Sequence, residues 1–417
     1  MKNKFLLISY NFHPELTGIG KYNGEMIHWL AEAGYDCTVV TAYPYYPYWK
    51  IQEPYFKKRF GYSTENEQFL SGGRITTHRC PMYVPAKPSG LKRILLDFTF
   101  LLSSFFKIVS LLPNYRFDTV FVVAPSFHFG LLGIIYKKLK KSKFIYHIQD
   151  LQIEAARDLN LIKSKKAVEF LFTIEDYIFS KADIISSISP GMISRIEQKA
   201  RRTVQSLPNW TDTQLFYPIT DKEDLRREFG FKEHERIILY SGAIGEKQGL
   251  EYIIQAAQEF RNQLAVKFII CGSGPYKNIL QAMAKNLSLQ NIVFLPLQPF
   301  DKFNQFLNLA DIHLVIQKAT ASDLVMPSKV TTILAVGGLA VITANEGSSL
   351  HTLVQEHNMG ILVPAEDQQA LNDGIKQALS LQNSHIAENA RTYAERNLSI
   401  DKIMQSFVST MQERQPA

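Results

Sequence analysis

The sequence predicts an α/β protein of two domains, each a doubly wound parallel β-sheet with helices on both faces. Its 417 residues exceed what one hydrophobic core normally supports. Short, continuously apolar runs alternate with amphipathic helical runs, which is typical of parallel strands buried on both faces. The same alternation begins again in the second half of the chain. Two Rossmann-like domains are therefore expected.

Strand-like and helix-like runs define the elements of each half. In the first half the strand-like runs are FLLISY, CTVVTA, TVFVVAP, FIYHIQD and ADIISSIS, and helix-like runs are YNGEMIHWLAEAG and HFGLLGIIYKKLKK. In the second half the strand-like runs are RIILYSG, VKFIICG, IVFLPL and LAVITA, and GLEYIIQAAQEF is a helix-like run. Prolines and Asn209 break the periodicity within residues 206–218. We expect domains at residues 1–208 and 209–395, followed by a terminal helical stretch at 396–417.

Composition narrows the class of protein. A hydrophobic content of 46% and a charged content of 20% describe an ordinary globular chain. The net charge of +7 favours anionic substrates or an anionic membrane surface, but the basic residues are too dispersed for a nucleic-acid-binding stripe. The three cysteines, Cys37, Cys80 and Cys271, lack C-x-x-C spacing. This pattern fits a reducing cytoplasm.

A glycine-rich turn follows the first strand-like run. Gly18, Gly20 and Gly24 come after a polar loop at residues 11–17, and backbone N–H groups at such a turn can face an anion. Their spacing departs from G-x-G-x-x-G, and no acidic residue ends the run CTVVTA, so a nicotinamide dinucleotide site is disfavoured. The alternative is structural, because glycines also permit a turn and close helix packing.

Two further candidate anion sites lie in the second half. Lys247 belongs to the loop AIGEKQG after the run RIILYSG, where it can supply charge to a diphosphate. Pro327, Ser328 and Lys329 stand where a helix is expected to begin, within residues 317–338. Proline near a helix start, free amides behind it and a lysine suit an anion. An ordinary capped helix is the alternative.

Polar side chains also follow the run FIYHIQD. His147, Asp150 and Glu154 are candidates for a general base or for contacts to substrate hydroxyls. Each has a structural alternative, and Asp150 in particular is placed to cap a helix. The sequence has no D-x-D triplet, no G-K-[ST] P-loop and no G-x-S-x-G elbow. No metal site is expected, and phosphotransferase and esterase functions are disfavoured.

One long apolar segment stands out, at residues 88–118. Asp97 and Lys107 interrupt it, and Lys92 and Arg93 lie at its front edge. These charges argue against a membrane span and favour a helix lying in the membrane interface. A buried helix pair is the alternative.

A second notable segment, at residues 43–62, is rich in aromatic and basic residues and includes Trp49. It suits a membrane interface, a loop that stacks on sugars or a plain surface loop.

The combined motifs resemble a known family. The segments NFHPELTGIGKYNGEM, YPYYPYW, HIQDLQIEAA, LPNWTDTQLF and DLVMPSKVTTILAVGG occur in this order over nearly the whole chain. They resemble the GT-B glycosyltransferases of family 4, and among them the colanic-acid biosynthesis glycosyltransferase subgroup. The resemblance implies that Gly18 and Gly20 border the donor phosphates and that Lys247 contacts the diphosphate.

The chain departs from this family at a pair of glutamates separated by seven residues. The first would fall at about Leu324 and the second at about Thr332. Asp323 is the hypothetical substitute for the missing carboxylate near the sugar, and Thr332 remains a candidate donor contact. The departure also suggests that Lys329 does more of the phosphate binding.

The resemblance further implies a retaining, metal-independent hexosyl transfer from a UDP- or GDP-linked sugar, without a cofactor. The sugar is expected to be fucose-like or N-acetylated. The acceptor, bound by the first domain, is a glycan on a polyprenyl diphosphate carrier in bacterial surface polysaccharide synthesis. Residues 88–118 would contact the cytoplasmic face of the inner membrane, and the terminal stretch at 396–417 would return to the first domain.

Two other functions stay open at this point. A nucleotide-sugar epimerase on a related scaffold would need the donor alone. Because the glutamate pair is missing, a non-catalytic nucleotide-binding subunit at the membrane is the second alternative. Product formation without an acceptor would indicate the epimerase. Nucleotide binding without turnover would indicate the non-catalytic subunit.

Overall fold

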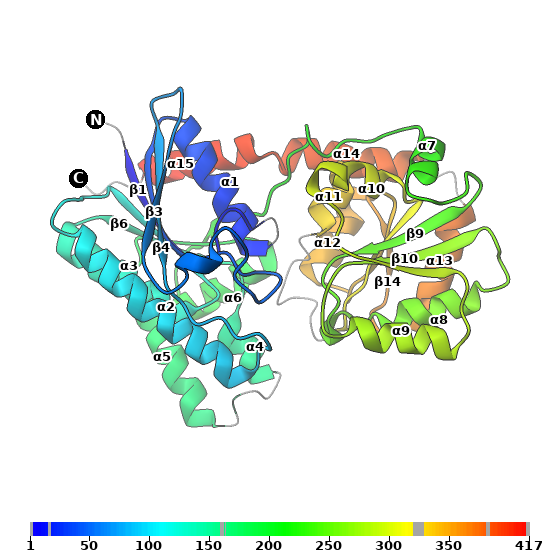
Figure 1. Ribbon diagram of the computed structural model, residues 1–417, viewed down its shortest axis with the longest axis horizontal. Coiled ribbons are helices and arrows are strands. Elements are labelled where there is room, and N and C mark those ends of the chain that lie inside the picture. The colour runs from blue at the N-terminus through cyan, green and yellow to red at the C-terminus, as the bar shows by residue number, and fades with distance from the viewer. Residues whose placement is uncertain are drawn as a thin grey trace. The chain divides into compact units, whose positions relative to one another are not determined.

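The structure, a computed structural model, describes residues 3–15, 18–158, 162, 164–319, 329–380 and 384–413. The chain forms two compact units. The first consists of Met1–Pro208 with Met404–Ala417, and the second of Asn209–Ile403. Each unit contains one β-sheet with helices packed on it, as the ribbon in Figure 1 shows.

The first unit is built on an eight-stranded sheet with the order β3-β4-β2-β1-β5-β6-β7-β8. Every pair is parallel except β3 with β4. The strands are β1 Lys4–Ile8, β2 Asp36–Ala42, β3 Ser63–Gln68, β4 Arg74–Cys80, β5 Thr119–Ala124, β6 Lys143–Ile148, β7 Ile184–Ser187 and β8 Gln205–Ser206. The antiparallel edge strand β3, STENEQ, was not among the predicted elements, because it is polar and largely exposed.

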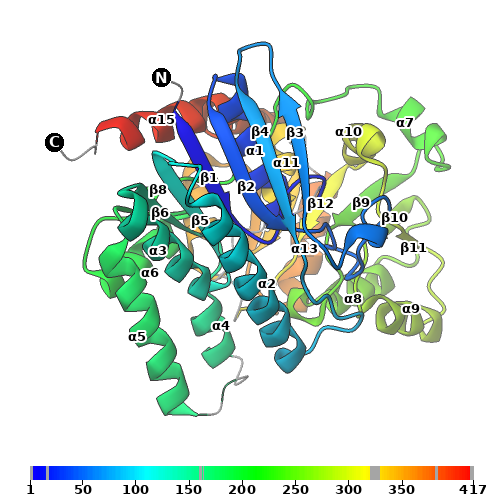
Figure 2. The same cartoon turned by 60° about the vertical axis from the view of Figure 1, so that its left-hand side comes forward.

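Helices cover this sheet on both faces (Figure 2). They are α1 Gly18–Glu32, α2 Gly90–Leu111, α3 Gly130–Lys140, α4 Gln152–Asp158, α5 Lys165–Lys181 and α6 Pro190–Ala200. The last helix, α15 (Ile400–Glu413), also contributes to this unit from Met404 onward. Phe407 of α15 packs edge-on against Phe121 of β5, and Lys143 Nζ donates a hydrogen bond to the Met411 carbonyl.

The second unit has a fully parallel six-stranded sheet with the order β11-β10-β9-β12-β13-β14. The strands are β9 Arg236–Ser241, β10 Val266–Cys271, β11 Ile292–Leu295, β12 Ile312–Val315, β13 Ala340–Thr343 and β14 Ile361–Val363. The helices are α7 Lys222–Glu228, α8 Glu251–Glu259, α9 Lys277–Asn286, α10 Phe303–Asn308, α11 Lys329–Ala335, α12 Ser349–His357, α13 Gln368–Ser380 and α14 Ser384–Asn397.

Alternation along the strands explains why this sheet is buried on both faces. On β9, Ile238 and Tyr240 belong to one hydrophobic core, whereas Ile237 and Leu239 belong to the core on the opposite face. Successive side chains of a strand point to opposite faces, so a strand covered on both sides must be apolar throughout. The continuous run RIILY meets this requirement.

The order of the strands creates a switch point in each sheet. In the first unit the chain moves from β1 to β2 on one side and continues with β5 on the other side of β1. In the second unit β9 has β10 on one side and β12 on the other. Loops at the carboxyl ends of two such strands diverge and leave room for ligands. The candidate residues are therefore best examined at these two places.

Helix α2 corresponds to the long apolar segment at residues 88–118. It is long and apolar enough to cross a membrane by length and composition, with a mean hydropathy of 1.8, and a third of that window is buried inside the protein. One face carries exposed apolar side chains: Leu91, Ile94, Leu95, Phe98, Leu102, Phe106 and Val109. The other face buries Leu96, Asp97 and Phe100. The segment is thus one amphipathic helix and not a buried helix pair.

Candidate functional site

Two glycine loops meet at the carboxyl ends of β9 and β10. The N–H of Gly242 donates to the Cys271 carbonyl over 3.0 Å, and the N–H of Ile244 donates to the Ser273 carbonyl over 2.9 Å. A Cβ atom on Gly272 would lie 1.9 Å from the Gly242 carbonyl oxygen. Only glycine at this position allows so close an approach of the two loops. The loop after β9 is therefore held firmly beside the switch point.

Lys329 extends beneath this loop from the start of α11. Its Nζ atom lies 3.7 Å from the centre of the Tyr240 ring. A Cβ atom on Gly242 would lie 3.2 Å from the same nitrogen. The nitrogen is buried and has no hydrogen-bond acceptor within the part of the chain that the structure describes. Burial lowers the pKa of Lys329 to about 7.

This arrangement suits an anionic ligand. A buried ammonium group that lacks an acceptor is costly, and a phosphate oxygen beside it would supply both a hydrogen bond and the opposite charge. The position agrees with the rule that ligands bind beyond the carboxyl ends of strands at the switch point of an α/β sheet. Of the predicted anion-binding residues, Lys329 has the clearest geometric support.

The other predicted residues of this unit are placed as follows. Lys247 falls in the short 3₁₀ helix η3 (Glu246–Gln248) of the loop after β9, and its side chain lies outside the described part of the chain. Asp323, Pro327 and Ser328 also lie outside the described residues. Thr332 Oγ1 donates to the Lys329 carbonyl over 3.0 Å within α11. The roles predicted for these residues stay predictions.

A buried polar group lies near the switch point of the first unit. Ser126, just beyond β5, donates from Oγ to Asp97 Oδ1 over 2.9 Å. The hydroxyl of Tyr10, just beyond β1, lies 3.4 Å from the same Oγ. Burial raises the pKa of Asp97 to about 6, although hydrogen bonds from Ser126 and Gln152 oppose the shift. Asp97, on the buried face of α2, therefore contacts the loop after β5 at this switch point.

The glycine turn serves close packing in this unit. Gly18 begins α1 with a φ of +59°, a conformation that glycine adopts without strain. A Cβ atom on Gly20 would lie 2.6 Å from Glu15 Oε2, and one on Gly24 would lie 3.1 Å from the Cβ atom of His13. The structural alternative for these glycines is therefore supported. The donor contact predicted for Gly18 and Gly20 stays untested by this geometry.

The structure places His147 in the core, a position that does not favour its predicted role as a catalytic base. It lies within β6, is 3% exposed, and its Nδ1 atom pairs with Ser186 Oγ at 3.0 Å. Burial lowers its pKa to about 3, so the ring is neutral at physiological pH. His147 also packs beside Phe121 of the central strand β5. The strand directs this side chain into the core and away from the carboxyl edge.

Asp150 and Glu154 have different surroundings. Asp150 lies two residues beyond the end of β6, is partly exposed, and its charge raises the pKa of Tyr10 and Tyr46. It therefore stays a candidate for contacts to a substrate. Glu154 on α4 is buried in an ion pair with Lys199, which indicates a structural role.

Sequence reasoning missed Glu15. This carboxyl is 4% exposed and accepts hydrogen bonds from the N–H groups of Tyr45 and Tyr46. Burial raises its pKa to about 7. The available signal was an acidic residue between a buried strand and a glycine turn, but its partners lie 30 and 31 residues away in the chain.

Comparisons with known proteins agree with the geometry. Residues 221–396 match the family model for glycosyl transferases group 1, and residues 17–210 match the model for a glycosyl transferase 4-like domain. The chain is 38% identical over 414 residues to the putative colanic acid biosynthesis glycosyl transferase WcaI of Escherichia coli (strain K12). That alignment covers 97% of this chain and 99% of the relative.

Solved structures share the fold. Sucrose-phosphate synthase from Thermosynechococcus elongatus superposes with a TM-score of 0.78 at 16% identity, with 99% of both chains covered. Anabaena Alr3699/HepE in complex with UDP and glucose gives a TM-score of 0.70 at 14% identity, covering 99% of this chain and all of that one.

The two-sheet fold and the two family models together define the class of protein: a two-domain glycosyltransferase of the GT-B type. More narrowly, the chain belongs to the group 1 glycosyl transferases with a family 4-like N-terminal domain, as the resemblance predicted. It is an enzyme of a family that includes polysaccharide-synthesising members.

We expect Gly20→Ala to destabilise the first unit by about 1–3 kcal/mol, because the added methyl group would overlap the Glu15 carboxylate. The measurement is thermal unfolding of the full chain. Gly90→Ala is the matched control, since a Cβ atom there meets nothing within 4 Å. Equal melting temperatures for both variants would contradict the packing role of Gly20.

Proposed function

We propose that this enzyme transfers a hexosyl group, with retention and without a metal ion, from a UDP- or GDP-linked sugar to a lipid-linked glycan. The acceptor belongs to a bacterial surface polysaccharide under assembly, and the sugar is fucose-like or N-acetylated. The second unit binds the donor and the first binds the acceptor. The observation that carries this proposal is Lys329, a buried ammonium group that lacks an acceptor among the described residues at the second switch point.

The chemistry needs charge stabilisation on the leaving group. When the bond between the sugar and the diphosphate breaks, negative charge develops on the diphosphate, and groups already aimed at it lower the barrier. Lys329, protonated when the diphosphate binds, would supply one positive charge from a buried position. A hydrogen bond to a charged group is typically worth about 1.5–3 kcal/mol. Lys247, in the loop after β9, and Asp323 are the proposed further contacts to the diphosphate and the sugar.

Support for acceptor binding by the first unit comes from the polar groups at its switch point. Asp150 is partly exposed beyond β6, and Asp97, Ser126 and Tyr10 lie together at the ends of β1 and β5. Carboxylates and hydroxyls are the groups that bind sugar hydroxyls, and a carboxylate can also accept a hydroxyl proton. We propose that Asp150 contacts the acceptor hydroxyl.

The outer face of α2 supports a peripheral membrane contact at residues 88–118. Leu91 is 82% exposed, and Phe98 and Phe106 are each 57% exposed. Lys92 and Arg93 lie in the first turn of the helix, where they would meet anionic headgroups. Because the opposite face is packed into the protein, we propose that α2 lies on the membrane and does not cross it.

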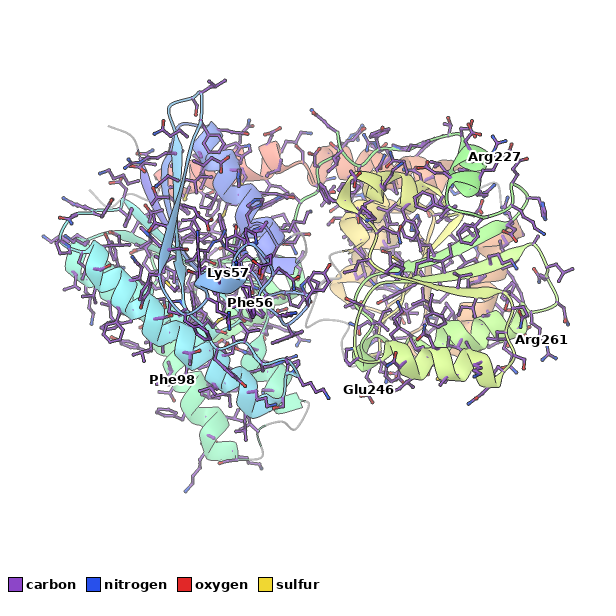
Figure 3. All side chains as sticks on the ribbon, viewed as in Figure 1. Phe56, Lys57, Phe98, Arg227, Glu246 and Arg261 are labelled. Atoms are coloured by element: carbon purple, nitrogen blue, oxygen red, sulfur yellow. The ribbon has the colours of Figure 1, made fainter. Side chains whose placement is uncertain are left out.

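A second segment with exposed aromatic and basic residues lies beside α2. Phe56 and Lys57 are labelled in Figure 3, as is Phe98 on α2. The segment at residues 56–62 packs on α2, because the Tyr62 hydroxyl donates to the Ser103 carbonyl over 3.0 Å. Phe60 is 81% exposed beside Arg59. Exposed aromatic rings among basic residues are typical of a membrane interface. We propose that this surface rests on the cytoplasmic face of the inner membrane.

A thermal-shift panel of UDP, GDP, ADP and dTDP, with and without a chelator, tests the donor site. One nucleotide should stabilise the wild type by about 2.7 kcal/mol at a hundredfold excess over Kd. The shift should survive chelation and shrink in Lys329→Met and Lys247→Ala. Lys376→Ala, at a half-exposed lysine of α13, is the control.

The alternatives have distinct outcomes in the same assays. No shift with any nucleotide contradicts the donor site, and a shift that needs a divalent cation contradicts metal independence. Conversion of the nucleotide sugar without an acceptor would instead indicate an epimerase, and binding without turnover a scaffold subunit. The anomeric configuration of the product, read by NMR, tests retention.

Donor affinity should depend on pH through Lys329. Burial holds its pKa near 7 in the free protein, whereas a bound diphosphate stabilises the charged form, so binding takes up a proton. Affinity should therefore be highest below pH 7 and fall by up to about tenfold per pH unit above it.

Calorimetry with a nucleotide sugar, in two buffers of different ionisation enthalpy, measures this proton uptake. The diphosphate diester of a nucleotide sugar does not titrate in this range and so does not obscure the result. Lys329→Met should bind more weakly and without the pH dependence. The same slope in both proteins would exclude Lys329 as the group that titrates.

Membrane binding should depend on the outer face of α2. We expect Phe98→Ser with Phe106→Ser to weaken binding to phosphatidylglycerol-containing vesicles by about tenfold or more, because each ring loses its burial in lipid. Co-sedimentation measures this, with Leu264→Ser, an 85% exposed site in the second unit, as the control. Unchanged sedimentation of the double variant would refute the contact.

A further inference from the structure

Glu15 joins two backbone segments through its carboxylate. Oε1 accepts the N–H groups of Tyr45 and Tyr46, each over 2.9 Å. Oε2 accepts the side-chain amide of Asn11 over 2.7 Å. The loop after β1 is thereby attached to the loop after β2. A buried carboxylate with three such donors is well satisfied, so its position is closely determined.

The same carboxylate packs on the glycine turn. Glu15 Oε2 occupies the space where a Cβ atom of Gly20 would lie, 2.6 Å away. A Cβ atom on Gly18 would lie 3.7 Å from Cε1 of Tyr46. The first turn of α1, Glu15 and the Tyr45–Tyr46 backbone therefore form one packed unit.

The segment that Glu15 holds carries a group of aromatic rings. The Trp49 ring lies 5.6 Å from the ring of Tyr45 and 6.5 Å from that of Tyr46. The guanidinium carbon of Arg93, on α2, lies 5.2 Å from the Trp49 ring centre. Asp150 is close enough to raise the pKa of Tyr46. Aromatic faces beside charged side chains provide stacking surface and hydrogen bonds for a sugar.

We propose that Glu15 is a positioning residue for the acceptor: it holds residues 43–50 against the glycine turn so that Tyr46 and Trp49 receive the acceptor sugar. This inference rests on the function proposed above. Glu15 itself touches no reacting atom and acts through the backbone of Tyr45 and Tyr46.

Because Glu15 can be protonated, the attachment of residues 43–50 to the glycine turn depends on pH. The groups that face the carboxyl are Arg79 from β4, the side chain of Asn11 and the phenols of Tyr45 and Tyr46. Burial raises the pKa to about 7 and outweighs the hydrogen bonds and Arg79, which lower it. Opening of the segment would return the carboxyl to water and to an ordinary pKa. Opening therefore becomes easier as the pH rises from the ordinary pKa of 4.5 to about 7, and changes no further above that.

Hydrogen exchange of the full chain tests the positioning without any substrate. Protection of peptides within residues 43–50 should fall by about tenfold in Glu15→Ala, because two backbone N–H groups lose their acceptor. Glu15→Gln keeps an acceptor oxygen and should retain most of this protection. In the wild type, protection corrected for intrinsic exchange should decline as the pH rises from about 5 to 7 and level off above that, and in Glu15→Gln it should not change. Glu32→Ala, at the exposed end of α1, is the control.

Steady-state kinetics test the consequence for the acceptor. The probes are short alkyl glycosides of glucose, galactose and N-acetylglucosamine, and KM is measured with whichever the wild type uses. Glu15→Ala should raise the acceptor KM about tenfold or more, Glu15→Gln should restore it, and the thermal shift by the donor nucleotide should stay unchanged.

If residues 43–50 are as well protected in Glu15→Ala as in the wild type, or if the acceptor KM does not change, the inference is overturned. If Glu15→Ala does not fold, the pH profiles of the wild type and Glu15→Gln decide in its place. A wild type that binds no nucleotide and transfers no sugar overturns the proposed function instead, and the exchange result still decides whether Glu15 holds the segment.

Discussion

Burial of the parallel strands of two sheets on both faces is the constraint on which the rest of this structure depends. Between the ends of the central strands, side chains must be apolar or held neutral, as His147 shows within β6. Polar chemistry is confined to the carboxyl edge, where the backbone leaves the sheet. Lys329 in the second unit and the Asp97–Ser126 pair in the first both lie at that edge. The two candidate binding sites are thus consequences of strand order.

Much of the fold was predictable from the sequence, because alternation of apolar runs and helices is a local property. The runs FLLISY, TVFVVAP and RIILYSG became β1, β5 and β9, and the structure divides within residues 206–218, where the periodicity breaks. The polar strand β3 was not predictable, since its pairing with β4 depends on a hairpin and not on apolar burial. Family membership was predictable from the ordered motifs.

Individual site residues were less predictable, because their roles depend on direction and on distant partners. His147 and Asp150 are three residues apart, yet one points into the core and the other lies beyond the strand. Lys329 acquires its environment from Tyr240 and Gly242, nearly ninety residues earlier in the chain. In α2, average hydropathy could not show that Asp97 turns inward while its neighbour Phe98 is exposed. Such contacts exist only in the folded chain.

In the order of the chain, the second unit is inserted into the first. The first unit both begins and ends the chain, and the second lies between Pro208 and Met404. Its two ends are adjacent, since Thr211 pairs with Ser399 in a β-bridge and the N–H of Thr211 donates to the Leu398 carbonyl over 2.9 Å. The second unit, which we propose binds the donor, is therefore a segment whose two junctions are neighbours. Exchanging it between relatives would cut no strand of either sheet, and under the proposed function this would recombine donor choice and acceptor choice separately.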